Sequence, residues 1–169
     1  MQVEIKEASN KKELRQFVKF NLNLYKGNPY HVPDLVDEEM MTLDKHRNPA
    51  FEFSEAVYYL AWRDGRIVGR IAGIINYRAN EIWKIKQARF GFVDFIDDDE
   101  VVNALFAAVE TWAKSKGMEE LTGPLGFTDL DNEGMLIEGF DQVSTIATIY
   151  NYPYYPTQME RLGFGKACD

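Results

Sequence analysis

The chain has 169 residues, of which 46% are hydrophobic and 27% are charged, a composition typical of one globular domain. Its apolar runs, such as residues 57–62, are far shorter than the roughly 20 residues of a membrane-spanning helix. Its polar N-terminus does not resemble a signal peptide, so we expect a cytoplasmic protein. The net charge of −8 disfavours nucleic acid and anionic membranes as partners, and the single cysteine, Cys168, excludes an internal disulfide.

The first third of the chain predicts one short strand and two helices. Val3 and Ile5 alternate with polar residues, as in a strand. Ser9 or Asn10 can then cap a helix with apolar residues at helical spacing, namely Leu14, Phe17, Val18 and Leu22. After a stretch that is broken by prolines, a second, short helix is expected to include Leu35, Val36, Glu39, Met40 and Leu43.

The centre of the chain predicts a β-sheet. Residues 55–63 are rich in Val, Tyr and Trp, and Asp64-Gly65 is a two-residue hairpin signal. The return strand, residues 66–78, alternates apolar and polar residues, and a third strand is expected at 88–96. Gly69 and Gly73 lie on the apolar face of the return strand, where a helix can approach closely or a bulge can form.

The last part of the chain predicts further helices and strands. A long helix is capped by an Asp at 97–99 and ends at Gly117; its buried residues are expected to be Val101, Val102, Leu105, Val109 and Trp112. Strands are expected at 118–122, at 143–150 and from Lys166, and a last helix runs from about Pro156 to Gly163. The order of elements indicates a single mixed α/β domain with helices packed on a central sheet.

Three segments carry a resemblance to a known family: VYYLAWRDGRIVGRIAG at 57–73, ARFGFVDF at 88–95 and YYPTQMERLGFGKA at 154–167. With the order of elements, they resemble the GCN5-related N-acetyltransferase (GNAT) superfamily. The segments that begin at Arg47 and Gly123 are similar to a divergent bacterial subgroup of longer, two-part proteins. The resemblance implies an α/β acyl-CoA N-acyltransferase-like fold, in which residues 1–169 are one GNAT-like domain, a fragment of a longer chain that stops before its last strand.

The same resemblance implies a cofactor and an activity. Members of the superfamily transfer an acyl group from acetyl-CoA or another acyl-CoA to an amine, and hold the pantetheine beside the strand that precedes the long helix. This places Phe92, Val93, Asp94 and Phe95 at the cofactor. Asn151 lies near the position of an asparagine that contacts the cofactor in the family. We therefore expect an acyl-CoA cofactor and a small-molecule amine substrate.

Two positions depart from the family pattern. The family binds the pyrophosphate of CoA on a glycine-containing loop at the N-terminus of the long helix. Here residues 97–100 are Asp-Asp-Asp-Glu, which lack glycine, suit the helix dipole themselves and would repel a pyrophosphate. The tyrosine that acts as general acid in many members is replaced by Met159, which cannot transfer a proton.

Other residues are candidates for the missing chemistry. Tyr154 and Tyr155 lie just before Met159 and either replace the acid or serve only in aromatic packing. Glu133 and Asp131, in the loop after the strand at 118–122, are candidates for the base that deprotonates the amine.

No metal site is expected. Residues 129–134 resemble the start of a calcium loop, but Phe140 occupies the position that requires a bidentate Glu. His31 and His46 are expected at the surface or beside a helix, and Cys168 is expected as a core residue of the last strand.

Charge is unevenly distributed along the chain. Residues 90–141 contain 13 acidic and 2 basic residues, a local charge of −11, and the remainder contains 14 acidic and 17 basic residues. Arg66, Arg70 and Arg78 share one face of the predicted return strand, where they either hold an anionic ligand or balance the acidic half.

Three hypotheses of function follow. The first is an acyl-CoA-dependent transferase domain with a displaced site. The second is a non-catalytic half that packs on a second GNAT-like half or on a second copy, as in a homodimer. The third is a binder of a small anionic ligand on the arginine face.

Overall fold

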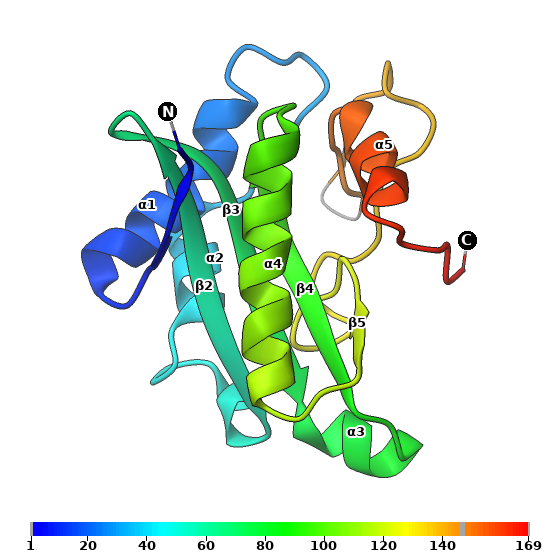
Figure 1. Ribbon diagram of the computed structural model, residues 1–169. Helices are drawn as coiled ribbons and strands as arrows, with labels where there is room; N and C mark the ends of the chain where they lie inside the picture. The colour runs from blue at the N-terminus through cyan, green and yellow to red at the C-terminus, as the bar shows by residue number, and fades with distance from the viewer. Residues whose placement is uncertain (1, 146–147, 169) are drawn as a thin grey trace.

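The computed structural model describes residues 2–145 and 148–168, and its centre is a five-stranded sheet with the strand order β1-β2-β3-β4-β5 (Figure 1). The strands are β1 (Glu4–Glu7), β2 (Ser54–Arg63), β3 (Arg66–Asn76), β4 (Gln87–Phe95) and β5 (Glu120–Thr122). Neighbouring strands are antiparallel from β1 to β4, and β5 is parallel to β4.

Helices cover both faces of this sheet. They are α1 (Lys11–Leu24), α2 (Val36–Leu43), α3 (Tyr77–Trp83), α4 (Asp99–Ser115) and α5 (Tyr154–Arg161), with a 3-10 turn, η1, at Pro49–Glu52. α4 packs on one face, and α1 and α2 lie on the other (Figure 1). The predicted mixed α/β fold is confirmed. None of the helices in the described ranges has the length and apolar character needed to cross a membrane.

Side-chain caps begin the two long helices. Asn10 accepts a hydrogen bond from the backbone N–H of Glu13, and the Glu13 carboxylate accepts one from the backbone N–H of Asn10. At α4, Asp98 accepts a hydrogen bond from the backbone N–H of Val101. The face of α4 that packs on the sheet buries Val101, Val102, Leu105, Phe106 and Val109.

Two glycines of β3 allow α4 to approach the sheet closely. A Cβ atom at Gly69 would lie 2.7 Å from Cδ1 of Leu105, and one at Gly73 would lie 2.9 Å from Cε3 of Trp112. Both distances are shorter than van der Waals contact, so a side chain at either position would force the Leu105 or Trp112 side chain to move. The close approach of a helix that these glycines predict is confirmed.

The strand predictions at the C-terminal half need correction. The return strand ends at Asn76 rather than at Arg78, because the Asn76 side chain accepts a hydrogen bond from the backbone N–H of Ala79 and starts α3. The described residues of 143–150 are not in a strand, and residues 146–147 lie outside the described ranges. Here the backbone N–H of Ser144 donates to the carbonyl of Tyr30, so this segment is fastened to the loop after α1. Residues 166–168 also contain no strand.

β4 and β5 separate soon after they begin to pair. Their ladder covers only Gln87–Arg89 and Glu120–Thr122. After the cis Gly123-Pro124 peptide bond, the backbone N–H of Leu125 still donates to the carbonyl of Phe90, and the segment then leaves β4. The pairing of β3 with β4 shifts in register between Arg70 and Ala72 of β3. On β4, Phe92 has a φ of 45°. This β-bulge bends β4 at the level where the two segments diverge.

Candidate functional site

A cavity of about 320 Å³ lies where β4 and the segment after β5 diverge. Its walls come from β4, from the loop between α1 and α2, from α2 itself and from parts of the segment between β5 and α5. The β4 side chains that line it, Phe92, Val93 and Asp94, are those at the bulge. The bulge therefore determines which β4 side chains reach the cavity.

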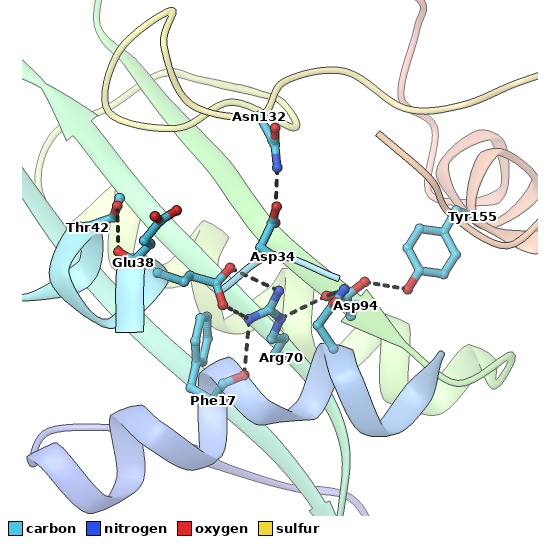
Figure 2. A network of polar contacts seen from close by, with 10 residues as sticks. Phe17, Asp34, Glu38, Thr42, Arg70, Asp94, Asn132 and Tyr155 are labelled. Carbon is cyan, nitrogen blue, oxygen red and sulfur yellow. Dashed lines mark hydrogen bonds and ion pairs between the residues drawn. The ribbon is translucent and has the colours of Figure 1, made fainter. Parts of the chain in front are cut away.

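A buried ion network forms part of the cavity wall (Figure 2). Arg70 of β3 is 3% exposed and donates hydrogen bonds from Nε to Oδ2 of Asp94 (2.8 Å) and from Nη1 to Oε2 of Glu39 (3.2 Å). The other carboxylate oxygen of Asp94 accepts a hydrogen bond from the Tyr155 hydroxyl at 2.8 Å. The network thus connects β3, β4, α2 and α5.

Burial and close contact determine the protonation of this network. Burial raises the pKa of Glu39, and the Arg70 guanidinium acts in the opposite direction. Burial acts to lower the pKa of Arg70, but Glu39 and Asp94 outweigh it, so that this pKa is raised. Burial and the Asp94 charge raise the pKa of Tyr155 well above its usual value. The Tyr155 hydroxyl therefore keeps its proton and donates it in the hydrogen bond to Asp94.

Carboxylates outnumber basic groups around the cavity. The acidic lining residues are Asp34, Glu38, Glu39 and Asp94, and Arg70 is the one Lys or Arg among the lining residues that the structure describes. Four carboxylates and one guanidinium give the lining a formal charge of −3 when His31 is neutral. A lining with this charge favours a cationic ligand, such as an ammonium group.

The first acidic side chains of α4 are bound by an arginine. Nη1 of Arg63 on β2 lies 2.8 Å from Oδ2 of Asp98, and its Nη2 lies 3.2 Å from Oε2 of Glu100. The hydrogen bond from Arg63 lowers the pKa of Asp98 to about 2. Asp98 is thus a charged helix cap that is held by its own counter-ion.

The other two acids at this helix end contact α5. Gln158 donates hydrogen bonds from Nε2 to Asp97 (3.0 Å) and Asp99 (2.9 Å), and Nε of Arg161 lies 3.3 Å from Oδ1 of Asp99. The acids at the N-terminus of α4 are therefore bound by side chains of β2 and α5, although Asp97, Asp99 and Glu100 stay exposed to solvent.

The sequence is similar to two curated bacterial proteins. It is 34% identical over 160 residues to protein YghO of Escherichia coli (strain K12), covering 95% of this chain and 41% of YghO. It is 30% identical over 158 residues to the bacterial ceramide synthase of Caulobacter vibrioides (strain NA1000 / CB15N), covering 93% of this chain and 41% of that protein. The chain thus spans about two fifths of the length of these curated relatives, and no protein-family model matches it.

Solved acetyltransferase structures have the same arrangement of elements. A tandem GNAT protein from the clavulanic acid biosynthesis pathway has a TM-score of 0.63 and 14% identity, over 96% of this chain and 43% of that one. A predicted acetyltransferase from Clostridium acetobutylicum, solved with acetyl-CoA, has a TM-score of 0.54 and 11% identity, over 98% and 92% of the two chains. The chain has the GNAT acyltransferase fold. The fold that the sequence motifs and the element order predict is confirmed.

The N-terminus of α4 does not fit the pyrophosphate that the GNAT resemblance implies. An anion there would face Asp97, Asp98, Asp99 and Glu100, and the backbone N–H of Val101 is already bound by Asp98. Two like charges about 4 Å apart repel by about 1 kcal/mol in water and by about 4 kcal/mol near a protein surface. The four carboxylates would thus oppose a pyrophosphate at this helix end.

Most residues predicted at the GNAT cofactor do meet at one place. Phe92, Val93, Asp94 and Asn151 all line the cavity. Phe95 is not among the lining residues; it is fully buried and its ring stacks on Tyr155, with the ring centroids 4.4 Å apart. The Asn151 side chain accepts a hydrogen bond from the backbone N–H of Leu136 and donates one to the Leu136 carbonyl. It therefore positions the segment around Leu136.

The predicted acid and base residues lie in two different places. Tyr155 lines the cavity, whereas Tyr154 donates its hydroxyl to a carbonyl oxygen of β4 at 2.6 Å and is not among the lining residues. Asp131 and Glu133 line a second hollow, formed mainly by residues 129–138. Asp131 accepts hydrogen bonds from two backbone N–H groups of its own loop, and Glu133 is exposed. The structure thus brings Tyr155, but neither candidate base, to the cavity.

Of the two alternatives for Arg66, Arg70 and Arg78, the shared anion-binding face is not formed, and Arg70 instead balances acidic residues. Arg70 is bound to two carboxylates, and Arg78 lies in α3 with its guanidinium carbon 4.2 Å from the ring centroid of Phe53. Arg66 is exposed at the hairpin. Cys168 is exposed rather than in the core. Within the described residues, no group of three His, Cys, Asp or Glu side chains is arranged to hold a metal ion.

Several polar cavity residues were not identified as functional candidates from the sequence, among them Asn21, His31, Asp34, Glu38 and Glu39. The sequence did indicate that Glu39 faces the protein interior, because Glu39 shares the helical spacing of the apolar residues of α2. His31 lies between prolines in a loop, and no sequence pattern predicts what such a loop contacts.

Proposed function

We propose that this chain is the amine-binding half of a two-part N-acyltransferase, and that a small-molecule amine binds in the cavity beside β4. The formal charge of −3 on the lining carries this proposal. The one guanidinium of the lining is bound to two carboxylates, so it is not free for an anionic ligand. An ammonium group in this cavity would meet carboxylate and hydroxyl oxygens, while its carbon chain would contact the apolar lining residues Val32, Leu35, Met135 and Ile149.

The relatives support both parts of the proposal. A ceramide is an amide of a long-chain amine, so a ceramide synthase is an enzyme that forms an amide from an amine. The chain covers 41% of that protein and 43% of the tandem GNAT protein. We therefore infer that residues 1–169 are one GNAT-like domain of a longer protein.

Acyl-CoA is the donor that the fold suggests, since the Clostridium acetobutylicum acetyltransferase was solved with acetyl-CoA. The acids at α4 do not fit its pyrophosphate, so the proposal assigns donor binding to a part of the protein outside residues 1–169. Within this chain, Asp94 and Tyr155 bind and orient the amine, and Phe92 and Val93 form the wall at the bulge. Asp131 and Glu133 are bases only for a ligand that extends to the second hollow.

The second candidate function is a non-catalytic half that packs on another half or on a second copy of this chain. The acids at α4 favour it, because they are bound within the chain by Arg63, Gln158 and Arg161. This candidate requires no ligand in the cavity, and so it predicts that amines do not bind.

Isothermal titration of the chain with hexylamine distinguishes the two candidates. We expect hexylamine to bind, and Glu38→Gln to weaken binding roughly two- to fivefold, because one cavity carboxylate is worth about 0.5–1 kcal/mol. Asp37→Asn is the matched control: it removes the neighbouring carboxylate of α2, which does not line the cavity, and leaves binding unchanged. The absence of heat with hexylamine, or equal effects of the two variants, would favour the non-catalytic half.

A further inference from the structure

His31 lies in the loop between α1 and α2, which is fastened over the cavity. The side chain of Asn28 accepts hydrogen bonds from the backbone N–H groups of Tyr30 and His31. On the other side of His31, the Ser144 hydroxyl oxygen accepts a hydrogen bond from the backbone N–H of Val32 at 2.9 Å. The backbone around His31 is therefore held on both sides.

The imidazole ring of His31 is positioned by aromatic contacts. It stacks on Tyr25, with ring centroids 4.3 Å apart and an angle of 9° between the planes. The ring of Tyr150 meets it at 70°, with centroids 6.3 Å apart. Tyr25 is itself buried and stacks on Tyr152, so the surface under the imidazole is rigid.

The imidazole of His31 has no polar partner, unlike most of the other titratable groups of the cavity. Asp94, Glu39 and Tyr155 belong to the Arg70 network, and Asp34 accepts a hydrogen bond from Asn132 (Figure 2). For the imidazole nitrogens of His31, the structure gives no hydrogen bond or ion pair with any residue in the described ranges. The Glu38 carboxylate shares this property, but it is exposed, whereas His31 is half-buried.

We propose that His31 is a ligand-binding residue of the cavity, whose neutral imidazole accepts a hydrogen bond from the bound amine. This inference rests on the proposed function, since it concerns the same cavity. It adds the group that recognises the N–H of the ligand, while the carboxylates supply the negative charge. The consequence is that proton binding to His31 and amine binding exclude each other.

Burial favours the neutral form of His31 in the free protein. Burial lowers the pKa of His31; Asp94 and Asp34 act to raise it, and Arg70 acts to lower it. An imidazole with a lowered pKa is neutral near pH 7 and has a free lone pair. A bound ammonium group would lower this pKa further, because it adds a positive charge beside the ring. By linkage, affinity for the amine falls as the pH decreases through the pKa of His31.

Nuclear magnetic resonance of the imidazole carbon-bound protons tests the inference, because the chain contains only two histidines. The His46→Gln variant lacks the exposed histidine, so its remaining imidazole resonance belongs to His31. We expect hexylamine to shift this resonance and to move its titration midpoint to lower pH. Calorimetry between about pH 7.5 and about pH 5.5 is expected to show weaker binding at acid pH, by up to about tenfold per unit below the pKa.

Two substitutions complete the test. His31→Phe keeps a ring to stack on Tyr25 but has no acceptor, and His31→Gln keeps an acceptor that does not titrate. We expect His31→Phe to weaken hexylamine binding and His31→Gln to flatten its pH dependence, with His46→Gln unchanged. Unaltered affinity and pH dependence in both His31 variants, with hexylamine bound, would overturn the role of His31 but not the proposed function. No binding to the wild-type chain would overturn both.

Discussion

Arg70, Asp94 and Glu39 form a buried ion cluster whose stability depends on all three side chains. Transfer of each ion from water costs several kcal/mol, and their mutual attraction offsets that cost only while every partner is present. The Arg70 guanidinium also donates a hydrogen bond to the carbonyl of Phe17 at 3.1 Å, so it joins α1 to the cluster. A lysine has no planar fork and cannot make these contacts together.

Substitution of Arg70 tests the cluster. We expect Arg70→Met to lower the free energy of unfolding by about 3–5 kcal/mol, because two buried carboxylates lose their counter-ion. Arg66→Met, at an exposed position of the same strand, is the control and is expected to change it by less than about 0.5 kcal/mol. Urea unfolding followed by circular dichroism measures both. A loss under about 1 kcal/mol for Arg70→Met would show that the carboxylates do not depend on it.

The role of Arg70 illustrates what the sequence could not predict about single residues. Its position on the polar face of a strand was readable, and so was the unusual concentration of arginines in that region. Its partners lie 31 residues before it and 24 residues after it, at Glu39 and Asp94. Only the packing of α2 and β4 against β3 brings these side chains together, so the pattern was equally compatible with a surface that binds anions.

At the scale of the element, the N-terminus of α4 combines a helix cap with an ion pair. Asp98 accepts one hydrogen bond from the backbone N–H of Val101 and two from the Arg63 guanidinium. Because the folded-state pKa of Asp98 is about 2, below its usual value of 3.8, its stabilising effect is complete above about pH 4 and is lost as the pH falls toward 2.

Two substitutions of Asp98 separate the cap from the ion pair. Asp98→Ala removes both and is expected to cost about 1–2 kcal/mol near pH 7. Asp98→Asn keeps a good cap and loses only the charge, so it is expected to cost less. The difference between wild type and Asp98→Asn is expected to shrink near pH 2.5, where the wild-type carboxylate is protonating. A difference that stays the same at both pH values in urea unfolding would contradict this assignment.

The regular elements were predictable from the sequence, and the irregular segment was not. Periodic apolar residues and capping side chains identified α1, α4 and the hairpin of β2 and β3, because these signals are local. The β-branched run at 143–150 resembled a strand, yet Ser144 binds the loop after α1, and the Tyr150 hydroxyl donates to the carbonyl of Phe140 in its own segment. Whether such a run joins a sheet depends on a free strand edge, which no local pattern specifies.

At the scale of the whole molecule, the net charge of −8 is distributed to oppose anions at α4 and to favour cations at the cavity. Free CoA derivatives are polyanions, whereas an alkylamine is a monocation at neutral pH. Salt separates these effects, since the Debye length falls from roughly 30 Å at 0.01 M to about 8 Å at 0.15 M. Charge-driven binding of an amine must therefore weaken as salt is added.

Titrations at about 0.01 M and about 0.15 M salt test this distribution of charge. We expect hexylamine to bind severalfold more weakly at the higher salt, whereas hexanol, which has the same carbon chain and no charge, responds little. Acetyl-CoA is expected to give no heat up to about millimolar concentration at either salt, because screening reduces the repulsion at α4 but does not free the N–H of Val101 from Asp98. Saturable binding of acetyl-CoA to this chain would show that the donor site lies within residues 1–169, and would return both substrates of the acyl transfer to this half.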